Sequence, residues 1–206
     1  MRTLLDKDMT MVQYKDVFKI KHNSVLPSKG KLLISEPFLQ DAYFQRSVVL
    51  LVEHGERGSM GLVLNKRIGF LLNDFFEGFG VMPRLPVFLG GPVASERLFF
   101  IHTLGNSIPG STLIDGDIYF DGDFECLLSY LRSGVPLDGK VKFFLGYSGW
   151  TENQLKTEIE SNSWLVSRQN KNILRGEGES FWKYAVQMVG GRYKNWVNYP
   201  KDPRLN

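Results

Sequence analysis

The longest unbroken run of apolar residues in this 206-residue chain is five residues long, from Val48 to Val52. That is far below the roughly 18 residues needed to cross a lipid bilayer, and it is a typical length for a β-strand. Other short runs, rich in β-branched and aromatic residues, are separated by glycine, proline and aspartate. The pattern therefore predicts a globular chain built from short strands, with no membrane contact.

The expected strands and helices follow one another in an uneven order. Strands are predicted at residues 31–35, 47–53, 60–64, 86–89, 97–102, 118–120, 140–146 and 164–166, with a hairpin loop at 54–59. Helices are predicted at 11–21, 70–80, 124–132, 151–161 and 180–189. Asp123 is a typical N-cap for the third of these, and Thr151 with Gln154 forms a capping-box pattern for the fourth. Strands come first and helices later, which favours a single α+β domain over a doubly wound sheet.

Charge is distributed unevenly along the chain. Residues 1–31 carry seven basic and three acidic side chains, residues 32–191 carry fourteen and eighteen, and residues 192–206 carry four and one. Specific nucleic-acid binding needs a basic surface on the folded domain, whereas the excess here lies in the two tails. The run 192–199 interleaves basic and aromatic side chains that can stack on bases, although such tails more often pack their aromatics on the domain. We therefore expect no specific nucleic-acid partner.

The single cysteine and the N-terminal residues indicate a compartment. Cys126 is the only cysteine, which excludes an internal disulfide framework and a four-cysteine zinc site. Asp6, Lys7 and Asp8 interrupt the region where a secretory signal would need continuous apolar residues. Both features favour the cytoplasm.

The sequence predicts no metal ion and no cofactor. His22, His54 and His102 lack the i, i+3 or i+4 spacing of a local metal site. A calcium loop starting at Asp121 would need glycine at the position of Cys126. Neither of the common glycine-rich nucleotide motifs is present. His102 ends an apolar run and is expected to be a hydrogen-bonded, half-buried histidine at a strand end.

The segment Gly146-Tyr-Ser-Gly-Trp150 comes nearest to a catalytic motif. A predicted strand, turn and helix around Ser148 resemble a nucleophile elbow, but Trp150 stands where that motif needs its second glycine. We therefore assign no catalytic residue. Two interpretations stay open. The segment is either a glycine turn that leads into a capped helix, with Trp150 in the core, or a set of free backbone N–H groups that could hold an anion.

Several segments together resemble one family. They are Gly61 to Lys66, Phe88 to Val93, the strand-end His102, Gly146 to Trp150, and Glu158 to Leu165. These segments occur in the order seen in the YqgE/AlgH family of bacterial proteins, and the chain is similar to that family from about Gly30 to Gly191. One branch of the family is described as a transcriptional regulator through alginate production, and no biochemical activity is established for the family.

The resemblance implies a fold and a division of the chain. The expected fold is α+β, with a mixed β-sheet that curls into an open barrel flanked by helices. Residues 30–191 would form the shared domain, residues 1–29 an N-terminal extension and residues 192–206 a basic, aromatic C-terminal tail. The position of Ser148 is commonly alanine in the family, which argues further against a nucleophile.

Our first functional hypothesis is a non-enzymatic regulatory or protein-interaction module with a protein partner. The alternative is a small-ligand-binding protein or an enzyme, with a cleft at predicted strand ends. That cleft would be formed by Asn65, Gly90–Val93, His102 and Gly146–Trp150, and its candidate binding residues are Asn65, Gly90, Gly91, Pro92, His102, Tyr147, Ser148 and Gly149. Direct DNA binding is a third and disfavoured hypothesis.

Overall fold

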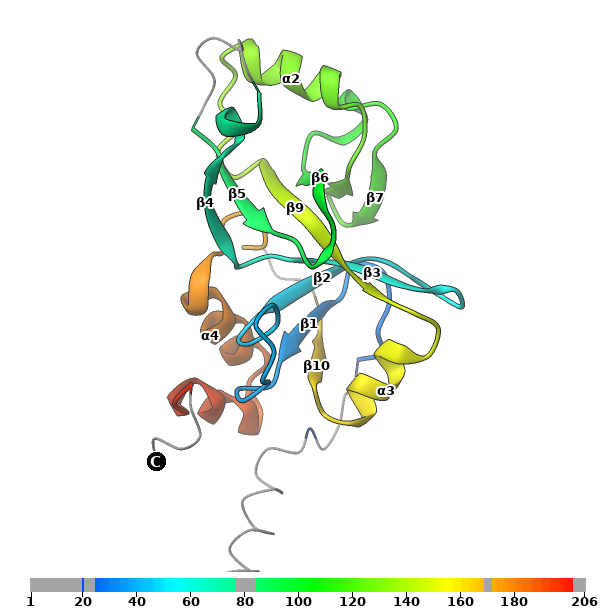
Figure 1. Cartoon of the computed structure of the whole chain (residues 1–206), viewed down its shortest axis with the longest axis vertical. Helices are drawn as coiled ribbons and strands as arrows, with labels where there is room; N and C mark the ends of the chain where they lie inside the picture. Colours follow the sequence, from blue (N-terminus) through cyan, green and yellow to red (C-terminus); the bar gives the residue numbers. More distant parts are fainter. Residues whose placement is uncertain (1–19, 21–24, 77–83, 169–171, 202–206) are drawn as a thin grey trace, which may run out of the picture.

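The computed structural model describes residues 20, 25–76, 84–168 and 172–201. In these residues the strands are β1 (Leu32–Ser35), β2 (Val48–Gly55), β3 (Gly58–Val63), β4 (Arg67–Leu71), β5 (Pro86–Leu89), β6 (Val93–His102), β7 (Thr112–Asp115), β8 (Ile118–Phe120), β9 (Val141–Trp150) and β10 (Trp164–Ser167). The α-helices are α2 (Phe124–Arg132), α3 (Gln154–Glu160) and α4 (Gly178–Val189), and the 3-10 helices are η1 (Leu72–Phe75), η2 (Gly105–Ser107) and η3 (Gly191–Asn198). Figure 1 shows how these elements are arranged.

The strands form one large sheet in the order β10-β1-β2-β3-β9-β6-β8-β7, and β5 lies between β9 and β4. The pairs are antiparallel except β5–β9, which is parallel. The predicted single α+β domain is therefore confirmed. The sheet does not close into a barrel, because β10 and β7 at its two ends do not pair with each other.

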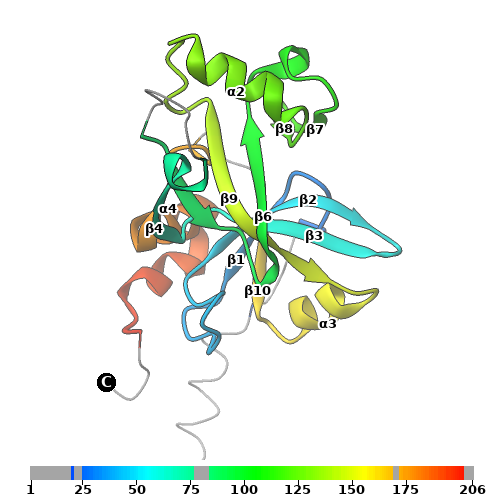
Figure 2. The ribbon, with the colours of Figure 1, turned by 45° about the horizontal axis from the view of Figure 1, so that its top comes forward.

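Strand β9 joins the two halves of the molecule. Its residues from Val141 to Tyr147 pair with β6, and its last three residues, from Ser148 to Trp150, pair with β3. Figure 2 shows β9 running beside β6 and on towards β3. A shift in β9 would therefore disturb hydrogen bonds in both halves.

Both faces of the sheet are covered in its lower half, which is formed by β10, β1, β2 and β3. Leu50 belongs to a core cluster that includes Trp182 of α4, whereas Leu51 belongs to a cluster that includes Leu155 of α3. Side chains alternate between the faces of a strand, so the run Val48–Val52 is apolar throughout because helices lie on both sides. A third cluster packs α2 against β5, β6 and β9 in the upper half.

Several local predictions are confirmed. Helix α2 has the predicted bounds, and its N-cap Asp123 accepts a hydrogen bond from the N–H of Cys126 at 2.9 Å. The hairpin loop between β2 and β3 lies where glycines and polar residues indicated it. Trp150 is 5 % exposed and packs in one cluster with Leu155 and Ile159, as the core interpretation requires.

Two predicted elements were wrong, and a third has a different start. Phe70 does not begin a helix. It lies in β4, which pairs with β5 and is followed by the short η1, while residues 77–83 lie outside the described residues. The segment Gly146–Trp150 is not a turn but the second half of β9. In both places pairing with a distant strand overrides the local signal. Helix α3 starts at Gln154 rather than at Thr151, because Asn153 is left-handed with φ 60°.

The C-terminal tail is part of the core as far as it is described. Trp196 of η3 is 2 % exposed, and Tyr193 and Val197 pack against the same cluster. The common arrangement, in which aromatic side chains cover the domain, is thus the one observed. The predicted helix at 11–21 lies outside the described residues except for Ile20.

Candidate functional site

The predicted glycines meet where the β5–β6 connection crosses β9. The N–H of Gly90 donates to the carbonyl of Leu145 at 2.8 Å, and the carbonyl of Gly90 accepts from the N–H of Val63 at 2.9 Å. A Cβ atom at Gly90 would lie 2.1 Å from the carbonyl oxygen of Gly146, and one at Gly91 would lie 2.3 Å from that of Tyr147. Backbone therefore packs directly on backbone here, and no side chain fits.

Ser148 lies in the middle of this crossing and is fully buried. Its hydroxyl donates to the carbonyl of Gly90 at 3.0 Å. The serine thus fastens the β5–β6 connection to β9, and its oxygen is not presented to solvent as the oxygen of a nucleophile elbow would be.

His102, the last residue of β6, lies beside the first residue of β9, at the opposite end of that strand from Ser148. It pairs with Val141, seven residues before Ser148, a span of about 23 Å along a strand. The imidazole is buried, with Nε2 2.9 Å from the hydroxyl of Ser111 and Nδ1 accepting the N–H of Leu104 at 3.1 Å. Burial lowers its pKa, although a backbone hydrogen bond at Asp121 opposes this. The prediction of a hydrogen-bonded histidine at a strand end is confirmed, but the expected half-burial was wrong, because His102 is fully buried.

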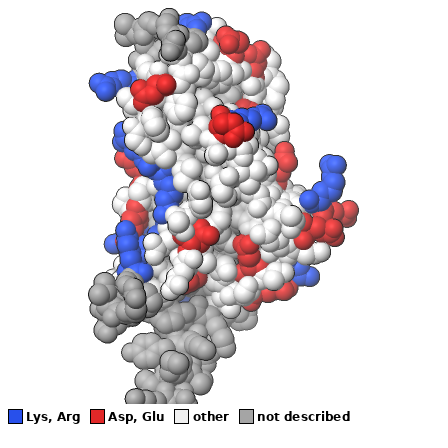
Figure 3. Space-filling view, in the orientation of Figure 1, with Lys and Arg blue, Asp and Glu red and all other residues white. Residues whose placement is uncertain are grey.

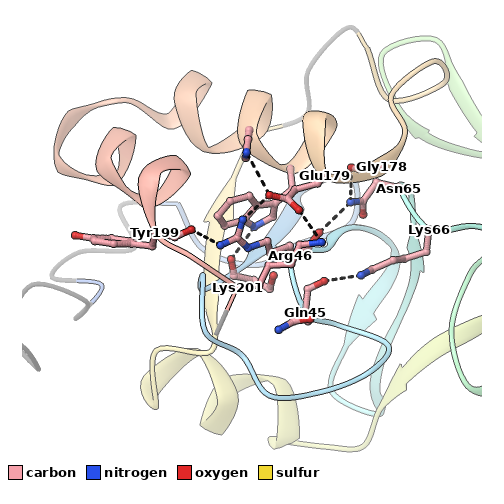
Figure 4. Close-up of polar contacts among 11 residues, drawn as sticks. Gln45, Arg46, Asn65, Lys66, Gly178, Glu179, Tyr199 and Lys201 are labelled. Atoms are coloured by element: carbon pink, nitrogen blue, oxygen red, sulfur yellow. Dashed lines mark hydrogen bonds and ion pairs between the residues drawn. The ribbon is translucent and has the colours of Figure 1, made fainter. Parts of the chain in front are cut away.

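Asn65 belongs to a buried polar cluster between the sheet and α4 (Figure 4). Its side-chain oxygen accepts the N–H of Val48 at 2.9 Å, and its amide nitrogen donates to the carbonyls of Arg46 and Gly178 at 3.0 and 2.9 Å. One side chain therefore links three chain segments. These bonds occupy the side-chain oxygen and nitrogen of Asn65, the two atoms through which it could bind a ligand.

Arg46 and Glu179 form the centre of the same cluster. The Arg46 guanidinium, 5 % exposed, donates to Glu179 and to the carbonyl of Tyr199, and it lies 5.0 Å from the Trp182 ring. Glu179 also pairs with Lys183 and Lys201. Burial opposes ionisation of Glu179, but hydrogen bonds from these three cations outweigh it and hold its pKa at about 2. The cluster fastens η3 and the following residues to the domain.

Lys142 of β9 is a buried cation without a neighbouring carboxylate at ion-pair distance among the described residues. It is 3 % exposed, donates to the carbonyls of Ile173 and Gly176 at 3.3 and 2.5 Å, and lies 4.0 Å from the ring centre of Phe88. Burial lowers its pKa to about 7. Lys142 was not among the residues predicted from the sequence, although a lysine inside the apolar strand Val141–Leu145 indicates a buried charge.

We expect the stability of the protein to rise with pH because of Lys142. Between pH 7 and about 10 the unfolded chain holds a proton on this amine that the folded chain has lost, so higher pH favours folding by up to about 1.4 kcal/mol per pH unit. Urea denaturation at pH 7, 8 and 9 should show this slope in the wild type and a flatter one in Lys142→Met. The exposed Lys140→Met is the control. Equal slopes in wild type and Lys142→Met would contradict the assignment.

The open parts of the predicted site lie on the face of the sheet next to the β2–β3 hairpin. A groove of about 520 Å³, here called the β9 groove, is lined by Glu53, residues 57–60, Val93, Tyr147 and residues 149–151. A cavity of about 750 Å³, here called the hairpin cavity, lies between the hairpin, α3 and the segment Leu26–Pro27. The structure thus brings Tyr147 and Gly149 to an open groove beside Val93, and it places Asn65 and His102 elsewhere.

Acidic side chains outnumber basic ones around these two hollows. Glu53, Glu56, Glu152 and Glu160 line them, against Arg57 and Lys156. Figure 3 shows red side chains gathered at the lower right, where the hairpin and α3 lie in Figure 1. Within the described part of the chain there is no group of three or more His, Cys, Asp or Glu side chains able to hold a metal ion. No helix there has the length and apolar character to cross a bilayer.

Residues 32–194 match the family model described as AlgH-like. The chain belongs to the AlgH-like family. A relative from Parabacteroides distasonis, called a UPF0301 protein, is 59 % identical over 198 residues, which cover 95 % of this chain and 100 % of that one. A UPF0301 protein from Bacteroides thetaiotaomicron is 46 % identical over 192 residues and covers 93 % and 97 %.

Solved structures agree with this assignment to the AlgH-like family. The solution structure of the AlgH protein from Pseudomonas aeruginosa aligns with a TM-score of 0.67 and 28 % identity, over 81 % of this chain and 92 % of that one. A crystal structure from Corynebacterium diphtheriae aligns with a TM-score of 0.70 over 85 % and 94 %, and its 19 % identity supports the fold alone.

Proposed function

We propose that this AlgH-like chain is a non-enzymatic regulatory module that binds another protein through the surface around the β2–β3 hairpin. The observation that carries the proposal is the pair of hollows, of about 520 and 750 Å³, that flank this hairpin. The hairpin projects from the body of the molecule in Figure 1, and the two hollows, which share Gly58, Ser59 and Thr151, form one continuous surface around it. Such a face suits a partner larger than a metabolite.

The predicted site residues support binding over catalysis. The hydroxyl of Ser148, the imidazole of His102 and the amide of Asn65 each make hydrogen bonds inside the fold, in three separate places. Acyl transfer and proton transfer need such groups to converge on one reacting atom. Tyr147 and Gly149, which do line the β9 groove, offer a surface rather than a nucleophile or a base.

Regulation would then act through a protein partner in the cytoplasm, and not through direct contact with DNA. Trp196, the tryptophan of the basic and aromatic tail, is buried and cannot stack on a base. The hairpin face carries more carboxylates than cations, and this would repel a phosphate backbone. A regulator of transcription is therefore proposed to work by binding a protein.

Small-ligand binding is a second candidate function. The hairpin cavity falls within the range of about 300–1,000 Å³ that is usual for ligand pockets. Leu155 and Ile159 supply apolar lining, and His54 and Lys156 supply polar groups. A metabolite that fills this cavity could control access to the hairpin face.

A photo-crosslinking experiment tests the proposed function. Benzoylphenylalanine would replace Glu56 at the exposed hairpin tip, and Asp117, exposed in the β7–β8 turn, would be the matched control. We expect a discrete protein adduct in bacterial cells from position 56 and none from position 117. Equal labelling from both positions, or an adduct with nucleic acid only, would refute the proposed interaction face.

A further inference from the structure

Gly149 differs from the other glycines near the crossing, because the fold gives no strong steric reason for it. Gly146 has φ 67°, and a Cβ atom there would lie 2.6 Å from the carbonyl oxygen of Gly91. Gly149 has no such backbone neighbour. A Cβ atom at Gly149 would meet the Tyr147 ring at 3.3 Å and a Val93 methyl group at 3.6 Å, both of them side chains. Glycine inside a strand weakens the strand, and it often marks a close approach by another molecule.

Gly149 forms the floor of the β9 groove. It pairs with Met60 of β3, and Met60 pairs in turn with Glu53 of β2, so these residues form one row across three strands. Tyr147 is two residues along β9 and shares this face, opposite Val93. Val93 is 39 % exposed. The groove therefore has apolar walls around a strip of bare backbone.

We propose that one apolar side chain of the partner protein lies in the β9 groove against Gly149, and that lysine or arginine residues flank this side chain in the partner segment. The inference rests on the proposed function and specifies its partner. The apolar anchor follows from the walls formed by Met60, Val93 and Tyr147. The basic flanks follow from charge, because the two hollows together are lined by four glutamates (Glu53, Glu56, Glu152 and Glu160) against Arg57 and Lys156.

The length of the surface favours a polypeptide over other occupants. The β9 groove and the hairpin cavity share Gly58, Ser59 and Thr151, so an extended segment could pass from one hollow to the next. A nucleic acid would place its phosphates beside four carboxylates. A basic peptide with one buried anchor satisfies both the shape and the charge.

Fluorescence anisotropy with defined peptides tests the anchor. The probe is a fluorescein-labelled peptide with one leucine between two arginine pairs, and it is compared with a peptide that has glycine in place of leucine. Burial of a leucine side chain predicts about tenfold tighter binding of the first peptide to the wild type. Gly149→Leu fills the groove and should abolish this difference. Gly69→Leu, at an exposed strand glycine with no atom within 4 Å of its Cβ position, should preserve it.

Further variants keep the test decisive. Val93→Asp should also abolish the preference for leucine if Gly149→Leu does not fold. A peptide with glutamates in place of the arginines should bind the wild type less tightly. The double variant Glu53→Lys and Glu56→Lys should reduce this difference in affinity between the arginine and glutamate peptides. Equal affinity for the leucine and glycine peptides, with crosslinking at position 56 intact, would overturn the anchor and leave the proposed function standing. Tighter binding of a single-stranded oligonucleotide, or self-association of the protein through this face, would overturn the basic peptide as the occupant.

Discussion

Gly90→Ala is expected to prevent stable folding of this protein. The added methyl group would lie 2.1 Å from the carbonyl oxygen of Gly146, far inside van der Waals contact. That oxygen belongs to β9, which is held by β6 on one side and by β3 on the other. The atoms cannot separate without loss of the hydrogen bonds that Gly90 makes to Leu145 and Val63. We expect a loss of about 3 kcal/mol or more in the free energy of unfolding.

Urea denaturation followed by circular dichroism measures this effect. Gly69→Ala is the matched control, because it adds the same methyl group to a strand residue with no atom within 4 Å of the Cβ position. The control should unfold at nearly the wild-type urea concentration. A Gly90→Ala protein as stable as the control would show that the crossing can relax, and that the glycine is present for another reason.

Trp150→Ala is expected to cost about 3–5 kcal/mol, a large share of the stability of a typical domain. The indole is 5 % exposed and lies 6.2 Å from the ring of Phe44 and 6.1 Å from that of Trp164. Its N–H donates to Glu158 at 2.8 Å. Truncation would leave a cavity between the sheet and α3, together with an acceptor that has lost one of its donors.

The Trp150 prediction has an internal control. Trp150→Phe keeps one six-membered ring in the core and removes the pyrrole part of the indole with its N–H donor, so it should be clearly more stable than Trp150→Ala. The same Glu158 oxygen also accepts the N–H of Trp164 at 2.8 Å and stays partly satisfied. Thermal unfolding of the three proteins gives the order. If Trp150→Ala unfolds at the same temperature as the wild type, α3 is not held to the sheet through this side chain.

Local sequence signals were sufficient for much of the fold. The bounds of α2 and the hairpin between β2 and β3 follow from residues close together in the chain. The burial of Trp150 was also predicted, although it depends on contacts with distant residues such as Phe44. Asp123 illustrates the reason, since its carboxylate bonds to an N–H only three residues away. Caps, turns and short apolar runs are interactions over a few residues, and the sequence displays them directly.

The candidate site depended on contacts that the sequence does not display. Arg46 meets Glu179, 133 residues away, and Trp182 donates to the carbonyl of Ser35 across 147 residues. The structural roles of Asn65, His102 and Ser148 could be assigned only from their hydrogen-bond partners in the folded protein. Tyr147 and Gly149 were candidates from the sequence, and the structure places them in an open groove because β9 continues as a strand beside Met60 and Val93.

The family, the α+β class and most of the elements were predictable from the sequence, because these depend on residue type and on spacing along the chain. Three features are visible only in the folded protein: Gly146–Trp150 is a strand, Phe70 lies in β4 and Lys142 is buried. Strand pairing and burial are set by residues far away in the sequence, and their energies exceed local conformational preferences of a few tenths of a kcal/mol per residue. For this reason the hollows beside the β2–β3 hairpin could be found only once β3, β6 and β9 lay side by side.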